Sequence, residues 1–287
     1  TAKDLAELIG TVRDALTVPI EGVVSDGQES LRKAVQKALP GVPHQLCQFH
    51  GLREAAKPIY EADRHAKKEL KKQVRGIRPL EREVEGQSDA ESQATLGYCA
   101  AVRSALTDDG RPPLEASGLK LRERLRKVAA SLEGLAQRMA LPKRLKRLLN
   151  ILQQGLEKTS ALWQDVEVAF GWVHEAAHIL KNEMGRDSRG VRRRLSGLLG
   201  ALARHGKLAG KLAEGVEHFG KVLRSYWPGL FHTYDVPDLP RTNNDLEQLF
   251  GSHRYHERRA TGRKVASPSL VLRGAVRIAA AAATRLQ

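Results

Sequence analysis

A long block of helical sequence, residues 51–235, separates two shorter stretches of different character, and this arrangement constrains the fold most. Within the block, leucine and alanine recur at helical spacing, with charged residues between them. Helix breaks are expected where glycine, proline and polar residues gather: Gly76–Pro79, Gly86–Ser88, Asp108–Pro113, Gly155, Gly185–Gly190 and Gly206–Gly210. The block therefore predicts an all-helical domain.

The stretch before the block, residues 1–50, predicts the order helix, strand, helix, strand. Pro19 ends the first helix, residues 20–27 predict a short strand, and Pro40 closes a second helix before a strand at 44–47. This order is typical of an α/β unit with parallel strands. The first helix carries an apolar stripe that we expect to face the core: Leu5, Leu8, Ile9, Val12 and Leu16.

The stretch after the block, residues 236–287, predicts a proline-containing loop and then a helix from about Asp245. We therefore expect residues 1–50 and 236–287 to form the two parts of one α/β core. Residues 51–235 would be a helical insertion in that core, which makes the protein mostly helical overall.

The charge of the chain favours a polyanionic partner. Its 48 Lys and Arg exceed its 33 Asp and Glu, and the formal net charge is +15. The excess concentrates in residues 118–150, 186–211 and 251–287, and such clustering favours nucleic acid over a generally basic surface. The two cysteines have no pairing pattern, and neither a membrane span nor a signal peptide is evident. These features favour a cytoplasmic protein without a membrane partner.

Asp26 is the first candidate site residue, because it follows a predicted strand at an Asp-Gly turn. Side chains at the carboxyl ends of parallel strands face the place where α/β proteins bind ligands. The alternative is a turn aspartate that caps the following helix.

Glu247 is the second candidate, on the helix that follows the insertion. At 100° per residue it shares one stripe with Asn243, Gly251, Arg254 and Arg258. A carboxylate for a cation, a glycine for close approach and arginines for phosphate suit a metal-bound phosphodiester. The alternative is a solvated helix face. A two-metal site also needs a third acidic ligand, and no other aspartate of the chain has the expected strand-end context.

Three motifs, in this order, resemble the Mutator-like (MULE) group of DDE transposases, which includes bacterial insertion-sequence enzymes. They are Val23-Val24-Ser25-Asp26-Gly27, then Cys47-Gln48-Phe49-His50, then Arg241-Thr242-Asn243-Asn244-Asp245-Leu246-Glu247. The resemblance covers both ends of the chain, and the helical block corresponds to the insertion domain of that family.

The resemblance implies a ribonuclease-H-like core, with an incomplete sheet here, and metal-dependent DNA cleavage and strand transfer at transposon ends. Asp26 and Glu247 would hold Mg²⁺ or Mn²⁺, with two ions in an intact site. Cys47, His50, Asn243 and Asn244 would lie near that site.

In the family, the first catalytic Asp stands on a strand before the opening helix. We therefore expect a fragment truncated at its N-terminus. The family also implies a homo-oligomer on transposon and target DNA, and a bacterial, nucleoid-associated protein.

Further DNA contacts are expected from Arg254 and Arg258, from Arg192, Arg193 and Arg194, and from Trp227. In related transposases an aromatic residue of the insertion stacks on an unpaired base, and Trp227 is the best candidate here. Trp163 and Trp172 are expected in the helical core. Two alternatives stay open. One is a non-catalytic DNA-binding remnant or derived protein that uses its basic helices, and the other is an unrelated helical nucleic-acid-binding protein.

Overall fold

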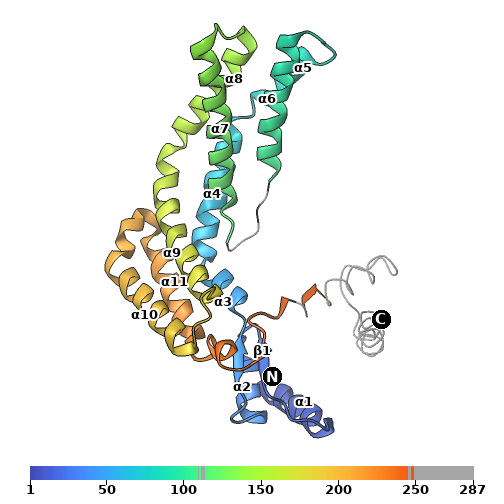
Figure 1. Cartoon of the computed structure of the whole chain (residues 1–287), viewed down its shortest axis with the longest axis vertical. Helices are drawn as coiled ribbons and strands as arrows, with labels where there is room; N and C mark the ends of the chain where they lie inside the picture. Colours follow the sequence, from blue (N-terminus) through green and yellow to red (C-terminus); the bar gives the residue numbers. More distant parts are fainter. Residues whose placement is uncertain (109, 111–113, 245–246, 249–287) are drawn as a thin grey trace. The chain divides into compact units, whose positions relative to one another are not determined.

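The computed structural model describes residues 1–108, 110, 114–244 and 247–248 (Figure 1). The chain divides into two compact units, each described here by itself. The first unit comprises Thr1–Cys47 and the segment that begins at Asp238. The second unit is the continuous stretch Gln48–Pro237. Five residues of the predicted site and its motif lie outside the described residues: Asp245, Leu246, Gly251, Arg254 and Arg258.

The first unit contains the expected helix–strand–helix–strand order: α1 (Ala2–Ala15), β1 (Val23–Ser25), α2 (Glu29–Ala38) and β2 (His44–Leu46). The two strands pair in parallel, with Val23 opposite His44 and Ser25 opposite Leu46. The prediction of a parallel α/β unit is therefore confirmed. In the described part of the chain, the sheet has these two strands.

The core of the first unit lies between α1 and α2, where small side chains allow close packing. Ala6, Ala34, Ala38 and Leu39 are buried there, and Leu5 and Ile9 pack against them. The rest of the expected apolar stripe is exposed: Leu8, Val12 and Leu16. The physical reason is that α2 covers one side of α1, and the described residues provide no second layer for the other side.

The segment after the helical block returns to the first strand. A Cβ atom placed on Gly22 would lie 2.6 Å from Cδ1 of Leu239, so Leu239 packs directly against the backbone just before β1. This contact joins residues more than 200 positions apart in the sequence. The helical block is therefore inserted between two parts of one unit.

The second unit is entirely helical in its described residues. Its long elements are α3 (Gln48–Ala55), α4 (Lys57–Gln73), α5 (Ile77–Val84), α6 (Ala90–Thr107), α7 (Ser117–Arg138), α8 (Lys143–Lys158), α9 (Trp163–Lys181), α10 (Ser188–His205) and α11 (Ala213–Tyr226). Short 3₁₀ turns connect some of them: η1 (Ser160–Leu162), η2 (Gly206–Leu212), η3 (Trp227–Gly229) and η4 (His232–Tyr234). Within the described residues, no helix combines the length and apolar character needed to cross a membrane.

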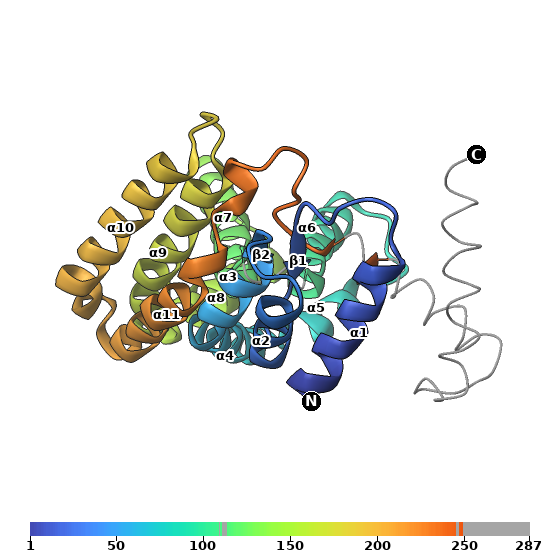
Figure 2. The same ribbon diagram turned by 90° about the horizontal axis from the view of Figure 1, so that it is seen from below.

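Two groups of helices make up this unit. Helices α4 to α8 share one apolar core around Leu70, Leu125 and Leu148, and Figure 1 shows α7 and α8 side by side. Helices α9, α10 and α11 pack against one another in the second group (Figure 2). Trp163 belongs to the first core: it is fully buried, and its indole N–H donates to Thr159 Oγ1 at 3.2 Å. Its expected core role is confirmed.

Gly155 does not break its helix, contrary to the expectation, and instead lies inside α8. A Cβ atom there would stand 3.2 Å from Cγ1 of Val74 and 3.3 Å from Cβ of Gln73. The glycine therefore allows α8 to approach α4 closely, which a sequence pattern does not distinguish from a helix break.

Candidate functional site

Asp26 lies directly after β1, at the carboxyl end of the strand, and its side chain is half-buried. Its Oδ1 accepts a hydrogen bond from the backbone N–H of Gln28 at 3.0 Å. Gly27 between them has a φ of 87°, which a residue with a Cβ adopts at a cost. Asp26 thus stabilises the turn before α2, but it does not cap that helix, whose N-cap Gln28 has no side-chain hydrogen bond to the helix. It also stands at the sheet edge where α/β proteins bind ligands.

Ser25 and His44 form a polar contact beside Asp26. The buried Ser25 hydroxyl lies 2.8 Å from His44 Nε2 on the neighbouring strand, and it accepts from the N–H of Gly27 at 3.3 Å. Sequence analysis did not select His44 as a site residue. His44 could have been recognised from the sequence, because it is a polar residue on a short parallel strand and such strands are ordinarily apolar on both faces.

The Cys-x-x-His segment crosses the boundary between the two units. Cys47 ends the first unit: its N–H donates to the carbonyl of Ser25 at 2.7 Å, and its thiol is buried. His50 lies on α3 in the second unit, half-buried, with its ring edge-on to Phe49 at 6.2 Å between centroids. Gln48 has a structural role, because its amide donates to Leu230 O and to Tyr234 Oη, each at 2.9 Å.

Glu247 and Asn243 lie one helical turn apart at the end of the described chain. The N–H of Glu247 donates to the carbonyl of Asn243 at 3.1 Å, so this turn is formed and both side chains share a face. Glu247 is exposed, and Asn244 is half-buried. The side-chain oxygen of Asn243 is buried without a hydrogen-bond partner among the described residues.

Among residues 1–108, 110, 114–244 and 247–248, no three His, Cys, Asp or Glu side chains gather as a metal-binding group. The structure places Asp26 and Glu247 in the same unit.

The arginines expected to bind DNA have different surroundings. The guanidinium of Arg192 lies over the ring of Phe231, 4.4 Å from its centroid, and Arg194 lies 3.9 Å from the carboxylate of Glu175. Arg193 between them is exposed. Arg192 and Arg194 therefore stabilise the second unit itself, which leaves Arg193 as the member of the triplet directed to solvent.

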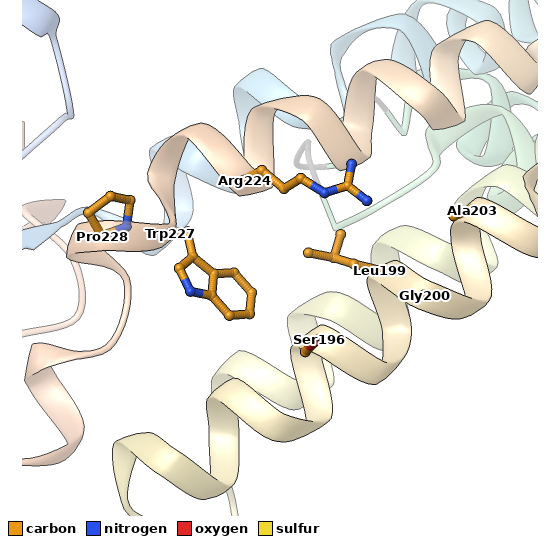
Figure 3. A pocket seen from close by; sticks show the side chains of 7 residues that line it. All are labelled: Ser196, Leu199, Gly200, Ala203, Arg224, Trp227 and Pro228. Atoms are coloured by element: carbon orange, nitrogen blue, oxygen red, sulfur yellow. The ribbon is translucent and has the colours of Figure 1, made fainter.

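Trp227 lines a pocket of about 580 Å³ between α10 and α11, the Trp227 pocket (Figure 3). Its ring meets Phe231 edge-on at 4.9 Å between centroids, which fixes the indole in place. Figure 3 shows Arg224 and Trp227 facing α10 across the pocket. The remaining lining residues are small or apolar: Ser196, Leu199, Gly200, Ala203 and Pro228.

A second pocket, of about 540 Å³, lies between α4 and the start of α7. Four cationic side chains of α4 line it together with Tyr60 and Ser117: Arg64, Lys67, Lys68 and Lys71. This group was not among the predicted site residues, because Glu61, Asp63 and Glu69 stand among the basic residues of α4 and the segment does not read as one basic cluster. The available signal was the spacing i, i+3, i+4, i+7, which places the four on one helix face.

No protein-family model, curated protein or solved structure matches this chain.

Proposed function

We propose that this chain is part of a DDE-type DNA transposase, in which Asp26 and Glu247 are two of the metal-binding carboxylates of a ribonuclease-H-like core. The contact between Leu239 and Gly22 is the observation that carries the proposal. Because of it, the segment that leads to Glu247 belongs to the same unit as the strand that leads to Asp26. A helical insertion between these two carboxylates is the arrangement that the three sequence motifs imply.

The donor atoms of these residues fit a hard divalent cation. Asp26 and Glu247 offer carboxylate oxygens, and the buried side-chain oxygen of Asn243 lies without a described partner one turn from Glu247. Oxygen ligands of this kind suit Mg²⁺ and Mn²⁺. When bound, such ions polarise the scissile phosphate and activate the attacking oxygen.

The other residues have positioning roles in this proposal. The turn at Gly27 and the bond from Gln28 hold one oxygen of Asp26, and this orients its carboxylate at the strand end. Arg193 contributes a solvent-directed cation to DNA binding, and Trp227 offers a ring on which an unpaired base can stack. Several copies of the chain would assemble on the DNA.

The test measures Mn²⁺ binding to the full chain by electron paramagnetic resonance, with Mn²⁺-dependent DNA nicking as a second readout. Asp26→Asn and Glu247→Gln should each weaken Mn²⁺ binding by about tenfold or more, since each removes one charged ligand. The matched control is Glu21→Gln, which removes an exposed carboxylate from the same unit and should leave binding unchanged.

Equal Mn²⁺ affinity in all four proteins would contradict the proposal. If DNA binding persisted in that case, the result would favour the alternative of a non-catalytic DNA-binding protein.

A further inference from the structure

Helix α4 presents a row of four cations along one face, here called the α4 basic row: Arg64, Lys67, Lys68 and Lys71. Residues three, four and seven positions apart are neighbours on a helix surface, so the row extends for about 11 Å. Arg64 and Lys68 are exposed, Lys71 is half-buried and Lys67 is buried. The row therefore combines side chains open to solvent with one that is fixed in the protein.

Two of the three carboxylates of α4 are engaged by other groups of the protein, and the third, Glu61, is exposed three positions before Arg64. Glu69 forms an ion pair with Lys72, at 2.7 Å, and Asp63 is buried against α7. Among the described residues, Glu69 pairs with Lys72 and not with Lys68, although Lys68 helps to lower the pKa of Glu69, and no ion pair with a carboxylate is found for Arg64. Both charges thus remain available to an external anion.

Helix α7 adds further positive charge beside the row. The ammonium group of Lys67 donates to the backbone carbonyl of Asp108. The carboxylate of Asp108 in turn meets two cations of α7, Lys120 at 2.9 Å and Arg124 at 3.5 Å. The hydrogen bond from Lys120 holds the pKa of Asp108 below its usual range, so this carboxylate is ionised at neutral pH. With Lys120 and Arg124 the row makes six cations against four nearby carboxylates, Glu61, Asp63, Asp108 and Glu115, so the described neighbourhood has a net positive charge.

The N-terminus of α7, which borders the pocket, is already occupied by protein. The two carboxylate oxygens of Asp63 accept from the N–H groups of Gly118 and Leu119, at 2.7 and 2.9 Å. These two backbone donors are therefore unavailable to a phosphate, although helix N-termini often bind one. The cations of the row that face solvent are Arg64 and Lys68, and cations in a line suit a chain of phosphates better than a single phosphate group.

We propose that the α4 basic row binds the phosphodiester backbone of a nucleic acid strand and recognises its charge rather than its base sequence. The inference rests on the proposed function only in taking nucleic acid as the partner, and it does not depend on the metal site. Cations that neutralise phosphates release condensed counterions, so binding through the row weakens steeply as salt rises.

The test uses the full chain in EDTA, so that no divalent ion contributes. Fluorescence anisotropy with a labelled random-sequence DNA duplex measures affinity over a range of salt concentrations. The double variant Arg64→Gln/Lys68→Gln should lower the slope of log affinity against log salt by about 2 and weaken binding tenfold to a hundredfold at about 0.1 M salt. Single-stranded DNA and RNA of equal length serve as parallel probes of the same phosphate chemistry.

The matched control is Lys33→Gln/Lys221→Gln, which removes the same charge from exposed lysines on α2 and α11. Each of these lysines pairs with a glutamate one turn earlier, at 2.6 and 2.8 Å. The control should keep the wild-type slope. Thermal unfolding of both double variants confirms that they are folded.

The inference is overturned if the row variant keeps the wild-type slope with all three probes, or if both double variants lose affinity equally. It is also overturned if the row variant loses binding to phosphatidylserine vesicles while its binding to nucleic acid is unchanged. If Mn²⁺ binding at Asp26 and Glu247 were intact alongside such a result, the proposal for the α4 basic row would be overturned while the proposed function would stand.

Discussion

Two of the pockets lined by described residues of the second unit have nearly equal volumes, about 580 and 540 Å³, and opposite chemistry. The Trp227 pocket is lined by an indole ring and by small or apolar residues, with Arg224 as its cation. The pocket at the α4 basic row is lined by four cations, a tyrosine and a serine. Because the two volumes are so similar, the lining side chains and not the size decide what each pocket can bind.

The two pockets differ in chemistry because different side chains line the space between the helices that border each of them. Gly200 and Ala203 on α10 lack long side chains, and so the ring of Trp227 remains uncovered beside them. On α4, long cationic side chains line the space, and those of Arg64 and Lys68 carry their charges toward solvent. An apolar ring holds a base by contact, whereas a row of cations holds phosphates by charge. Salt dependence separates the two modes.

The largest expected effect is a loss of stability from disturbing the close contact between α4 and α7 beside the basic pocket. A Cβ atom on Gly118 would lie 2.5 Å from the backbone oxygen of Asp63, which cannot move without shifting α4. Gly118→Ala should therefore lower the free energy of unfolding by about 3 kcal/mol, measured by urea denaturation.

Gly134→Ala on the same helix is the control for Gly118→Ala. A Cβ atom there meets nothing within 4 Å, so this variant should gain about 0.5–1 kcal/mol from helix propensity. Equal stability of the two variants would show that α4 and α7 are not in close contact at Gly118.

The next effect concerns Asp63 itself. Asp63→Ala leaves two buried N–H groups without acceptors and should cost about 2–3 kcal/mol in urea denaturation. Asp63→Glu is a control that keeps the charge and lengthens the side chain, and it should recover part of this loss.

Asp63 also predicts a pH dependence of stability. Burial raises the pKa of its carboxyl group above the usual Asp value, against the hydrogen bonds from Gly118 and Leu119. A raised folded-state pKa means that the native state holds this proton more tightly than the unfolded chain. Wild-type stability relative to Asp63→Asn should therefore fall as pH rises from about 4 through the raised pKa. A difference that grows with rising pH would contradict this assignment.

A smaller effect is expected at the Trp227 pocket. Trp227→Ala should weaken binding of single-stranded DNA by about tenfold, within the range for loss of one stacked base, and leave the salt slope unchanged. Trp227→Phe keeps a ring and should retain most of the affinity. A fall in the salt slope would show that this pocket acts through charge, and the contrast with the α4 basic row would then be lost.

The smallest effect is on the stability of the α4 basic row variant. Arg64 and Lys68 are exposed, so Arg64→Gln/Lys68→Gln should change the free energy of unfolding by less than about 0.5 kcal/mol. Urea denaturation checks this value. A larger loss would mean that the row serves packing rather than binding.

Local patterns in the sequence were sufficient for the parallel unit and for most helix boundaries. Pro19 follows α1, and Pro40 and Gly41 separate α2 from β2, so these residues bound the elements around Asp26. Strands β1 and β2 form where apolar residues adjoin turn residues. The ribonuclease-H-like core, the metal ions and the transposase activity remain proposals. Arg254 and Arg258 of the expected DNA-binding group lie outside the described residues.

The sequence by itself determined where most helices and the two strands begin and end, because periodicity, proline and glycine act over a few residues; it failed at Gly155 and at the break between α7 and α8. Only the tertiary structure decided which side chains are covered. Leu8 and Ile9 are adjacent on α1, yet Ile9 packs against α2 while Leu8 is exposed. Gly118 is required because Asp63, 55 positions earlier, occupies the space beside it. Such contacts depend on how distant segments pack, and a local pattern carries no information about that packing.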